Sequence, residues 1–157
     1  MRYRPRPFTA LIAGLLVAVP LIGAPAQEPP HGAGVSVSIQ VTELRNTKGV
    51  VRACMSPDPK KFPRCQGDPA AYRAVVKAND AGEIRFTGVT PGRYAIALLH
   101  DENDNGKADR ALGMMPKEGY GFSRDAKVRM GPPKFEEAAI DIGTSPVSQS
   151  IRMRYML

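Results

Sequence analysis

The sequence has few of the residues on which enzyme and metal chemistry most often depends. It contains no tryptophan, two cysteines and two histidines in 157 residues. His31 lies in a Gly- and Pro-rich stretch, so a Ser-His-Asp or Cys-His mechanism would have to use His100. No Gly-x-Ser-x-Gly nucleophile elbow and no Cys-x-x-Cys pair occurs. We therefore assign no catalytic residues, and an enzyme is the minority hypothesis.

Helical periodicity is also missing: 15 prolines and 15 glycines are scattered through the chain, and no stretch of ten or more residues shows it. Apolar and polar residues instead alternate, which is typical of half-buried strands. The alternating runs are Val35–Val41, Val50–Met55, Tyr72–Ala78, Glu83–Thr87, Arg93–His100, Ala138–Ile142 and Val147–Tyr155. They predict an all-β fold, a single antiparallel β-sandwich of about seven strands. Asn46–Gly49 has turn chemistry, so the first two runs should form a hairpin.

Residues 1–26 are predicted to be a secretory signal peptide. Three arginines precede the uncharged stretch Phe8–Ala24, which is shorter than the roughly 20 apolar residues of a membrane span. Cleavage removes three of the 22 basic residues and none of the 15 acidic ones, so the net charge falls from +7 to +4. Residues 27–34 are predicted to be a flexible lead-in and residues 35–157 the β-sandwich domain. We expect a periplasmic or secreted protein without a membrane span.

Cys54 and Cys65 are eleven positions apart and enclose a Pro-rich segment. Export favours a disulfide between them, because oxidising compartments preserve such bonds. A catalytic redox pair or a zinc site is a weaker explanation, since the spacing is not that of Cys-x-x-Cys and no histidine accompanies the two cysteines. The predicted bond is therefore structural.

The segment Asp101–Asp109 carries the sharpest motif. Side-chain oxygens recur at its first, third, fifth and ninth positions, a glycine is sixth, and the seventh residue of such calcium loops provides its backbone carbonyl. The predicted metal ligands are Asp101, Asn103, Asn105, Lys107 and Asp109. The twelfth position is Leu112 instead of a bidentate Glu, so Ca²⁺ would need water or a remote carboxylate such as Glu118, and binding should be weak. A plain Asx turn is the alternative.

Residues 101–137 show no strand or helix signal, yet they contain bulky apolar residues, so we expect one long ordered loop. Its apolar anchors are Tyr120, Phe122 and Phe135. Crowded carboxylates in its Gly- and Asn-rich turn suit a cation better than a general acid–base pair. Met114 and Met115 favour apolar anchoring over Cu(I) binding. Lys60–Lys61 is the one dibasic step after the signal, which argues against nucleic acid as a partner.

Three stretches together resemble a known bacterial family, the domain of unknown function 2141. They are Gly88–Asp109, Met115–Ser123 and Gly131–Ala139. The similarity extends from about Val35 to Tyr155. It implies an exported β-sandwich, immunoglobulin-like or transthyretin-like and akin to carboxypeptidase-regulatory modules, and it implies no settled activity. The family's usual turn reads Asp-Glu-Asn-Gly-Asn-Gly-Lys, and Asp104 here replaces the first Gly without changing the predicted ligands.

Two hypotheses follow from these patterns. The favoured one is an exported, non-enzymatic β-sandwich module with a binding or structural role, stabilised by weakly bound Ca²⁺ in its acidic loop and directed to an unknown protein or envelope partner. The alternative is a small periplasmic hydrolase or metal-handling protein that uses His100 with the acidic loop. A pocket that joins His100, Asp109 and Glu118 would favour the alternative.

Overall fold

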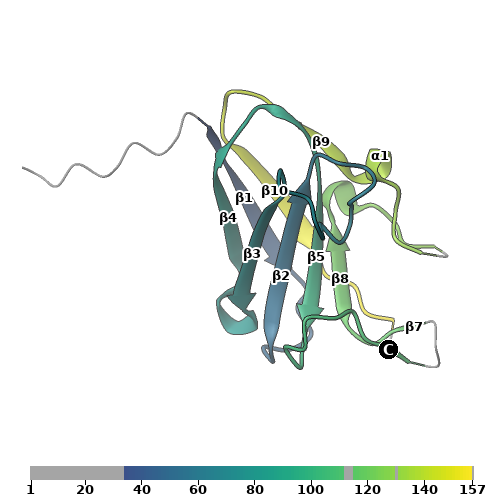
Figure 1. Ribbon diagram of the computed structural model, residues 1–157. Coiled ribbons are helices and arrows are strands. Elements are labelled where there is room, and N and C mark those ends of the chain that lie inside the picture. The colour runs from purple at the N-terminus through teal and green to yellow at the C-terminus, as the bar shows by residue number, and fades with distance from the viewer. Residues whose placement is uncertain (1–33, 112–114, 130, 157) are drawn as a thin grey trace, which may run out of the picture.

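Two β-sheets packed face to face form the fold, which the computed structural model describes for residues 34–111, 115–129 and 131–156 (Figure 1). The three-stranded sheet has the order β10–β1–β4, and the larger sheet has the order β3–β2–β5–β8, with β9 also paired to β5. The strands of the two sheets are β1 (Val35–Thr42), β2 (Val50–Ser56), β3 (Tyr72–Lys77), β4 (Glu83–Val89), β5 (Gly92–Asp101), β8 (Gly119–Phe122), β9 (Ala139–Ile142) and β10 (Val147–Arg152). The predicted all-β sandwich is confirmed.

Short elements complete the described part of the chain. They are the strand pair β6 (Arg110–Ala111) and β7 (Met115–Pro116), the 3₁₀ turns η1 (Ala78–Asp80) and η2 (Ser123–Asp125), and the single-turn helix α1 (Phe135–Ala138). The predicted signal peptide and all but the last residue of the predicted lead-in lie outside the described residues.

The core between the sheets consists of the apolar residues that alternate along the strands. Residues such as Ile39 on β1, Met55 on β2 and Ile96 on β5 have no exposed surface. Their side chains meet because successive residues of a strand point to opposite faces, so one face of each sheet becomes apolar. The periodicity in the sequence therefore identified the side chains that hold the two sheets together.

The predicted hairpin between the first two runs is wrong. β1 pairs with β4 and β10, whereas β2 pairs with β3 and β5 in the other sheet. Residues 43–49 carry the chain from one sheet to the other, so that Ile39 and Met55 lie in the same core. The β1–β10 pair is parallel, which makes it the exception among the described pairings, all others being antiparallel.

A second apolar cluster covers the outer face of the larger sheet. Ala95 and Ala97 of β5 alternate with the core residues and point outward, where Phe62, Phe122 and Phe135 cover them. The prediction that residues 101–137 pack onto the sandwich is thus confirmed for Phe122 and Phe135, which are 7% exposed. The expectation that this segment lacks strands is wrong, because β8 lies within it and extends the sheet.

Candidate functional site

The acidic loop starts where β5 ends, at the end of the sandwich that also carries β7, and α1 lies at the opposite end (Figure 1). Asp101 has no exposed surface. Its Oδ1 accepts a hydrogen bond from the Asn105 N–H at 3.0 Å, and its Oδ2 accepts one from the Gly106 N–H at 2.8 Å. Gly106 has a φ of 76°, a conformation that glycine adopts without strain. Asp101 therefore organises the turn as the first residue of the motif should.

The other predicted ligands meet around one carboxylate. The side-chain amides of Asn103 and Asn105 each donate to Asp109 Oδ2 at 2.9 Å. The amide oxygen of Asn103 accepts the Asn105 N–H at 3.2 Å, and that of Asn105 accepts the Lys107 N–H at 2.8 Å. Lys107 takes part in this network through its N–H, and its carbonyl as a ligand remains a prediction. Three of the five predicted residues, Asn103, Asn105 and Asp109, thus converge through their side chains, while the Asp101 side chain binds the backbone of the same loop.

Arg52 on β2 compensates part of the loop's negative charge. Its Nε lies 2.7 Å from Asp101 Oδ2, and its Nη2 lies 2.6 Å from Asp104 Oδ1. Burial alone would raise the pKa of Asp101, but the hydrogen bonds from Arg52, Gly106 and Asn105 outweigh it, and the pKa is lowered. Asp101 is accordingly ionised at neutral pH. The spacing of the motif could not reveal Arg52, because it comes from a neighbouring strand.

Glu118 joins the loop from the residue before β8. It is 4% exposed, and its Oε2 accepts the Asp109 N–H at 3.1 Å. Its Oε1 is buried and accepts no hydrogen bond from the described residues. Burial raises the pKa of Glu118, the Asp109 N–H lowers it, and the negative charges of Asp101 and Asp109 together with a hydrogen bond to the Asp101 carboxylate raise it further. Leu112, at the twelfth position of the motif, lies outside the described residues.

His100 is built into a different set of contacts. It is fully buried, its Nε2 lies 2.8 Å from the Lys48 carbonyl and its Nδ1 lies 2.8 Å from the Tyr155 hydroxyl. A carbonyl only accepts, so Nε2 carries the proton and Nδ1 accepts from Tyr155. The guanidinium of Arg45 lies 4.5 Å from the centroid of the Tyr155 ring. These contacts place His100 with Lys48 and Tyr155, and its Nδ1 lies 4.0 Å from Glu102 Oε1 of the loop, while Glu118 contacts Asp109.

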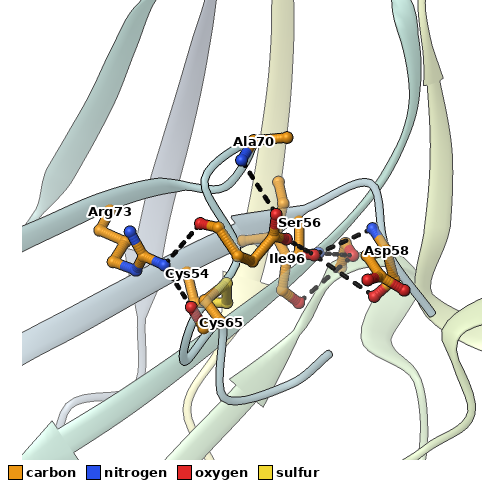
Figure 2. The surroundings of a disulfide bond; sticks show 9 residues. Cys54, Ser56, Asp58, Cys65, Ala70, Arg73 and Ile96 are labelled. Atoms are coloured by element: carbon orange, nitrogen blue, oxygen red, sulfur yellow. Dashed lines mark hydrogen bonds between the residues drawn. A yellow bond between two sulfur atoms is a disulfide. The ribbon is translucent and has the colours of Figure 1, made fainter. Parts of the chain in front are cut away.

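The predicted disulfide between Cys54 and Cys65 is present, with a Cα–Cα distance of 6.1 Å (Figure 2). Cys54 lies on the outer face of β2, so the bond attaches a loop to that face. Arg73 of β3 donates to the Cys65 carbonyl and, at 2.7 Å, to the Asp68 carbonyl. Ser56 Oγ donates to Asp68 Oδ2 at 2.5 Å. The disulfide and this polar network together hold the loop that supplies Phe62 to the outer cluster.

The described part of the chain has neither a preformed cluster of metal-binding side chains nor a membrane-spanning helix. Within residues 34–111, 115–129 and 131–156, no three His, Cys, Asp or Glu side chains already form a metal-holding group. In the same ranges, no helix is long and apolar enough to cross a membrane.

The comparison with protein families gave one match. Residues 39–150 match the family model of an uncharacterised protein conserved in bacteria, DUF2141. No curated protein and no solved structure matches the chain. Because this family model covers most of the chain, the protein belongs to the DUF2141 family.

Proposed function

We propose that the chain is an exported, non-enzymatic β-sandwich module with a structural or binding role in the periplasm or outside the cell. The end of the sandwich that carries the acidic loop is proposed to be the binding end. The disulfide supports export, since such bonds persist in oxidising compartments. The three N-terminal arginines and the uncharged stretch after them support it as well. The transthyretin-like character implied by the family resemblance remains a prediction.

The burial of His100 is the observation that supports a non-enzymatic role. Both ring nitrogens are bonded within the protein, and no part of the side chain is exposed. A general base must come within hydrogen-bond distance of the proton that it removes, which a sealed imidazole cannot do. His100 instead ties the 43–49 connection and the C-terminal Tyr155 to the end of β5. The residue that a hydrolase would need is used for structure.

The acidic loop is arranged for binding more than for acid–base catalysis. Asp101 is fully buried and accepts hydrogen bonds from Asn105, Gly106 and Arg52. Its pKa is lowered, so it does not retain a proton to donate at neutral pH. The loop therefore gathers carboxylate and amide oxygens at one end of the sandwich.

Export is tested by fractionating cells that produce the full chain and measuring the intact mass of the protein. We expect it outside the cytoplasm, beginning at Gln27 and with the mass of the disulfide form. A cytoplasmic protein that retains Met1 and has two free thiols would contradict the proposal.

The non-enzymatic role is tested with ester, phosphate-ester, glycoside and peptide substrates, using wild type and His100→Asn. We expect both proteins to match the buffer rate, and His100→Asn to lower the free energy of unfolding by roughly 2 kcal/mol through its lost hydrogen bonds. Hydrolysis by wild type that disappears in a folded His100→Asn protein would support the hydrolase instead. Thermal melts of both proteins separate a folding defect from a loss of chemistry.

A further inference from the structure

We propose that the Asp101–Asp109 loop and Glu118 together bind a hard divalent cation, with calcium preferred to magnesium. This inference rests on the proposed function, which assigns the binding role to the end of the sandwich with the acidic loop, and deepens it by naming the ligand. Glu118, nine residues beyond Asp109, is almost fully buried and directs a carboxyl group into the loop's own carboxylates.

The Glu118 oxygen that accepts no hydrogen bond is the observation that favours a ligand. Buried polar atoms are nearly always hydrogen-bonded, and a buried carboxylate oxygen without a partner is unfavourable. Glu118 Oε1 accepts no hydrogen bond from the described residues, although Oε2 of the same group accepts the Asp109 N–H, and the carboxyl group lies within hydrogen-bond reach of the Asp101 carboxylate. A cation beside this carboxylate would satisfy the oxygen and offset the charge at once.

The charges around Glu118 favour a divalent ion. Asp101 and Asp109 both act on Glu118 as negative neighbours. Arg52 is bonded to Asp101 and Asp104, so it offsets part of the loop's charge. Within the described residues, neither Asp109 nor Glu118 has an ion pair with a cationic side chain. Asp109, and Glu118 once it is ionised, thus leave negative charge that a divalent cation would neutralise.

The remaining donors favour calcium over magnesium. Asn103 and Asn105 each use their amide oxygen for one backbone N–H, and a carbonyl-type oxygen has two lone pairs. Calcium takes six to eight oxygens in flexible arrangements, whereas magnesium requires a near-ideal octahedron. The Asn103 and Asn105 amides must turn from Asp109 toward the ion, so the site is not preformed. Affinity should therefore be weak, with a Kd on the order of 10⁻⁴ to 10⁻³ M.

The test is a calorimetric and thermal titration of the full chain, disulfide intact, with calcium chloride, magnesium chloride and sodium chloride at matched ionic strength. We expect saturable calcium binding, and a rise in Tm of about 5 °C at ten times Kd. Magnesium should give a smaller rise at the same concentration. No calcium response at 10-fold above the expected Kd range would overturn the proposal, and equal responses to both ions would overturn the preference for calcium.

Glu118→Gln and Asp104→Asn form a matched pair, because each replaces one carboxylate of this region by its amide. Asp104 is exposed and faces Arg52, and its φ of 52° is one that Asn tolerates. We expect calcium affinity to fall at least tenfold in Glu118→Gln and less than threefold in Asp104→Asn. Equal losses in both would indicate general attraction by negative charge, and an unchanged Glu118→Gln would mean that the loop is only an Asx-rich turn.

The stability order of the variants should also reverse with calcium. Without calcium, Glu118→Gln should melt at or above the wild-type temperature, because the amide removes an ionisable carboxyl group that is buried beside Asp101 and Asp109. In calcium the wild type should melt higher. If Glu118→Gln does not fold, Asp109→Asn tests the same site through its other uncompensated carboxylate and should lose calcium affinity to a similar extent. Export, oxidation and lack of hydrolysis are measured without calcium, so failure here would leave the proposed structural role standing.

Discussion

Removing the Cys54–Cys65 disulfide should lower the free energy of unfolding by about 3 kcal/mol and leave the loop docked. The two cysteines are 11 residues apart, and the chain-entropy treatment of a loop this short gives about 3 kcal/mol at 25 °C. That contribution comes from restricting the unfolded chain. It should therefore be lost in Cys54→Ala/Cys65→Ala even if every native contact of the loop persists.

The loop should stay docked because other contacts hold it. The Phe62 ring packs edge-on at centroid distances of 5.9 Å from Phe122 and 6.1 Å from Phe135. Asp68 is bonded to Ser56, and its carbonyl accepts from Arg73. Phe62→Ala removes a buried ring and should cost about 3 kcal/mol by itself. Because one effect acts on the unfolded state and the other on native packing, the two losses should add.

A double-mutant cycle tests this reasoning. The free energy of unfolding is measured by urea denaturation at 25 °C for wild type, Cys54→Ala/Cys65→Ala, Phe62→Ala and the combined variant, all in the same sucrose concentration to keep the last one folded. We expect additivity within about 0.5 kcal/mol. A disulfide contribution below about 1 kcal/mol would refute the entropy estimate. A Phe62→Ala change that is nearly silent without the disulfide would show that the bond itself docks the loop.

Two further predictions concern the backbone and the acid stability. Gly49→Ala should lower Tm more than Gly88→Ala does. Both glycines have positive φ, but a Cβ at Gly49 would lie 2.1 Å from the Asp101 carbonyl oxygen, whereas one at Gly88 would meet nothing within 4 Å. Equal losses of Tm would argue against the close approach at Gly49. Burial would raise the pKa of Asp125, but hydrogen bonds from Arg154 and Arg152 lower it. The ionised Asp125 therefore stabilises the fold fully above the unfolded pKa of about 4, and this stabilisation is lost as pH falls through the lower folded pKa. Asp125→Asn should therefore flatten the acid side of the Tm-against-pH curve relative to wild type, and parallel curves would contradict this.

The alternating runs predicted the core correctly because alternation records burial directly. Val37 and Ile39 were expected on one face of their strand, and both have no exposed surface. Alternation carries no information on which strand is the neighbour, however. The 43–49 connection has turn residues suited to a hairpin, but it crosses between the sheets. The hydrophobic contact between sheets outweighed the local turn preference.

Strand β8 could not be predicted from local propensity. Its sequence is Gly-Tyr-Gly-Phe, and glycine weakens a strand. The glycines are explained by contacts made elsewhere in the chain: a Cβ at Gly119 would lie 2.3 Å from the Tyr155 ring, and one at Gly121 would lie 2.7 Å from the Ile151 side chain. Only the folded structure shows why small residues are needed there.

The same strand explains why the spacing of the motif located the acidic loop but could not show that Glu118 packs against it. β5 and β8 pair in antiparallel register with His100 opposite Gly119, and continuing this register by one residue puts Asp101 opposite Glu118. Like charges directly opposite each other destabilise a strand pair, and here both groups are also buried. The register thus places Glu118 where the charge of Asp101 raises its pKa, and a proton retained on Glu118 is one way to relieve the conflict. A cation bound between the loop and Glu118 would relieve it and would make the pairing itself depend on the ion.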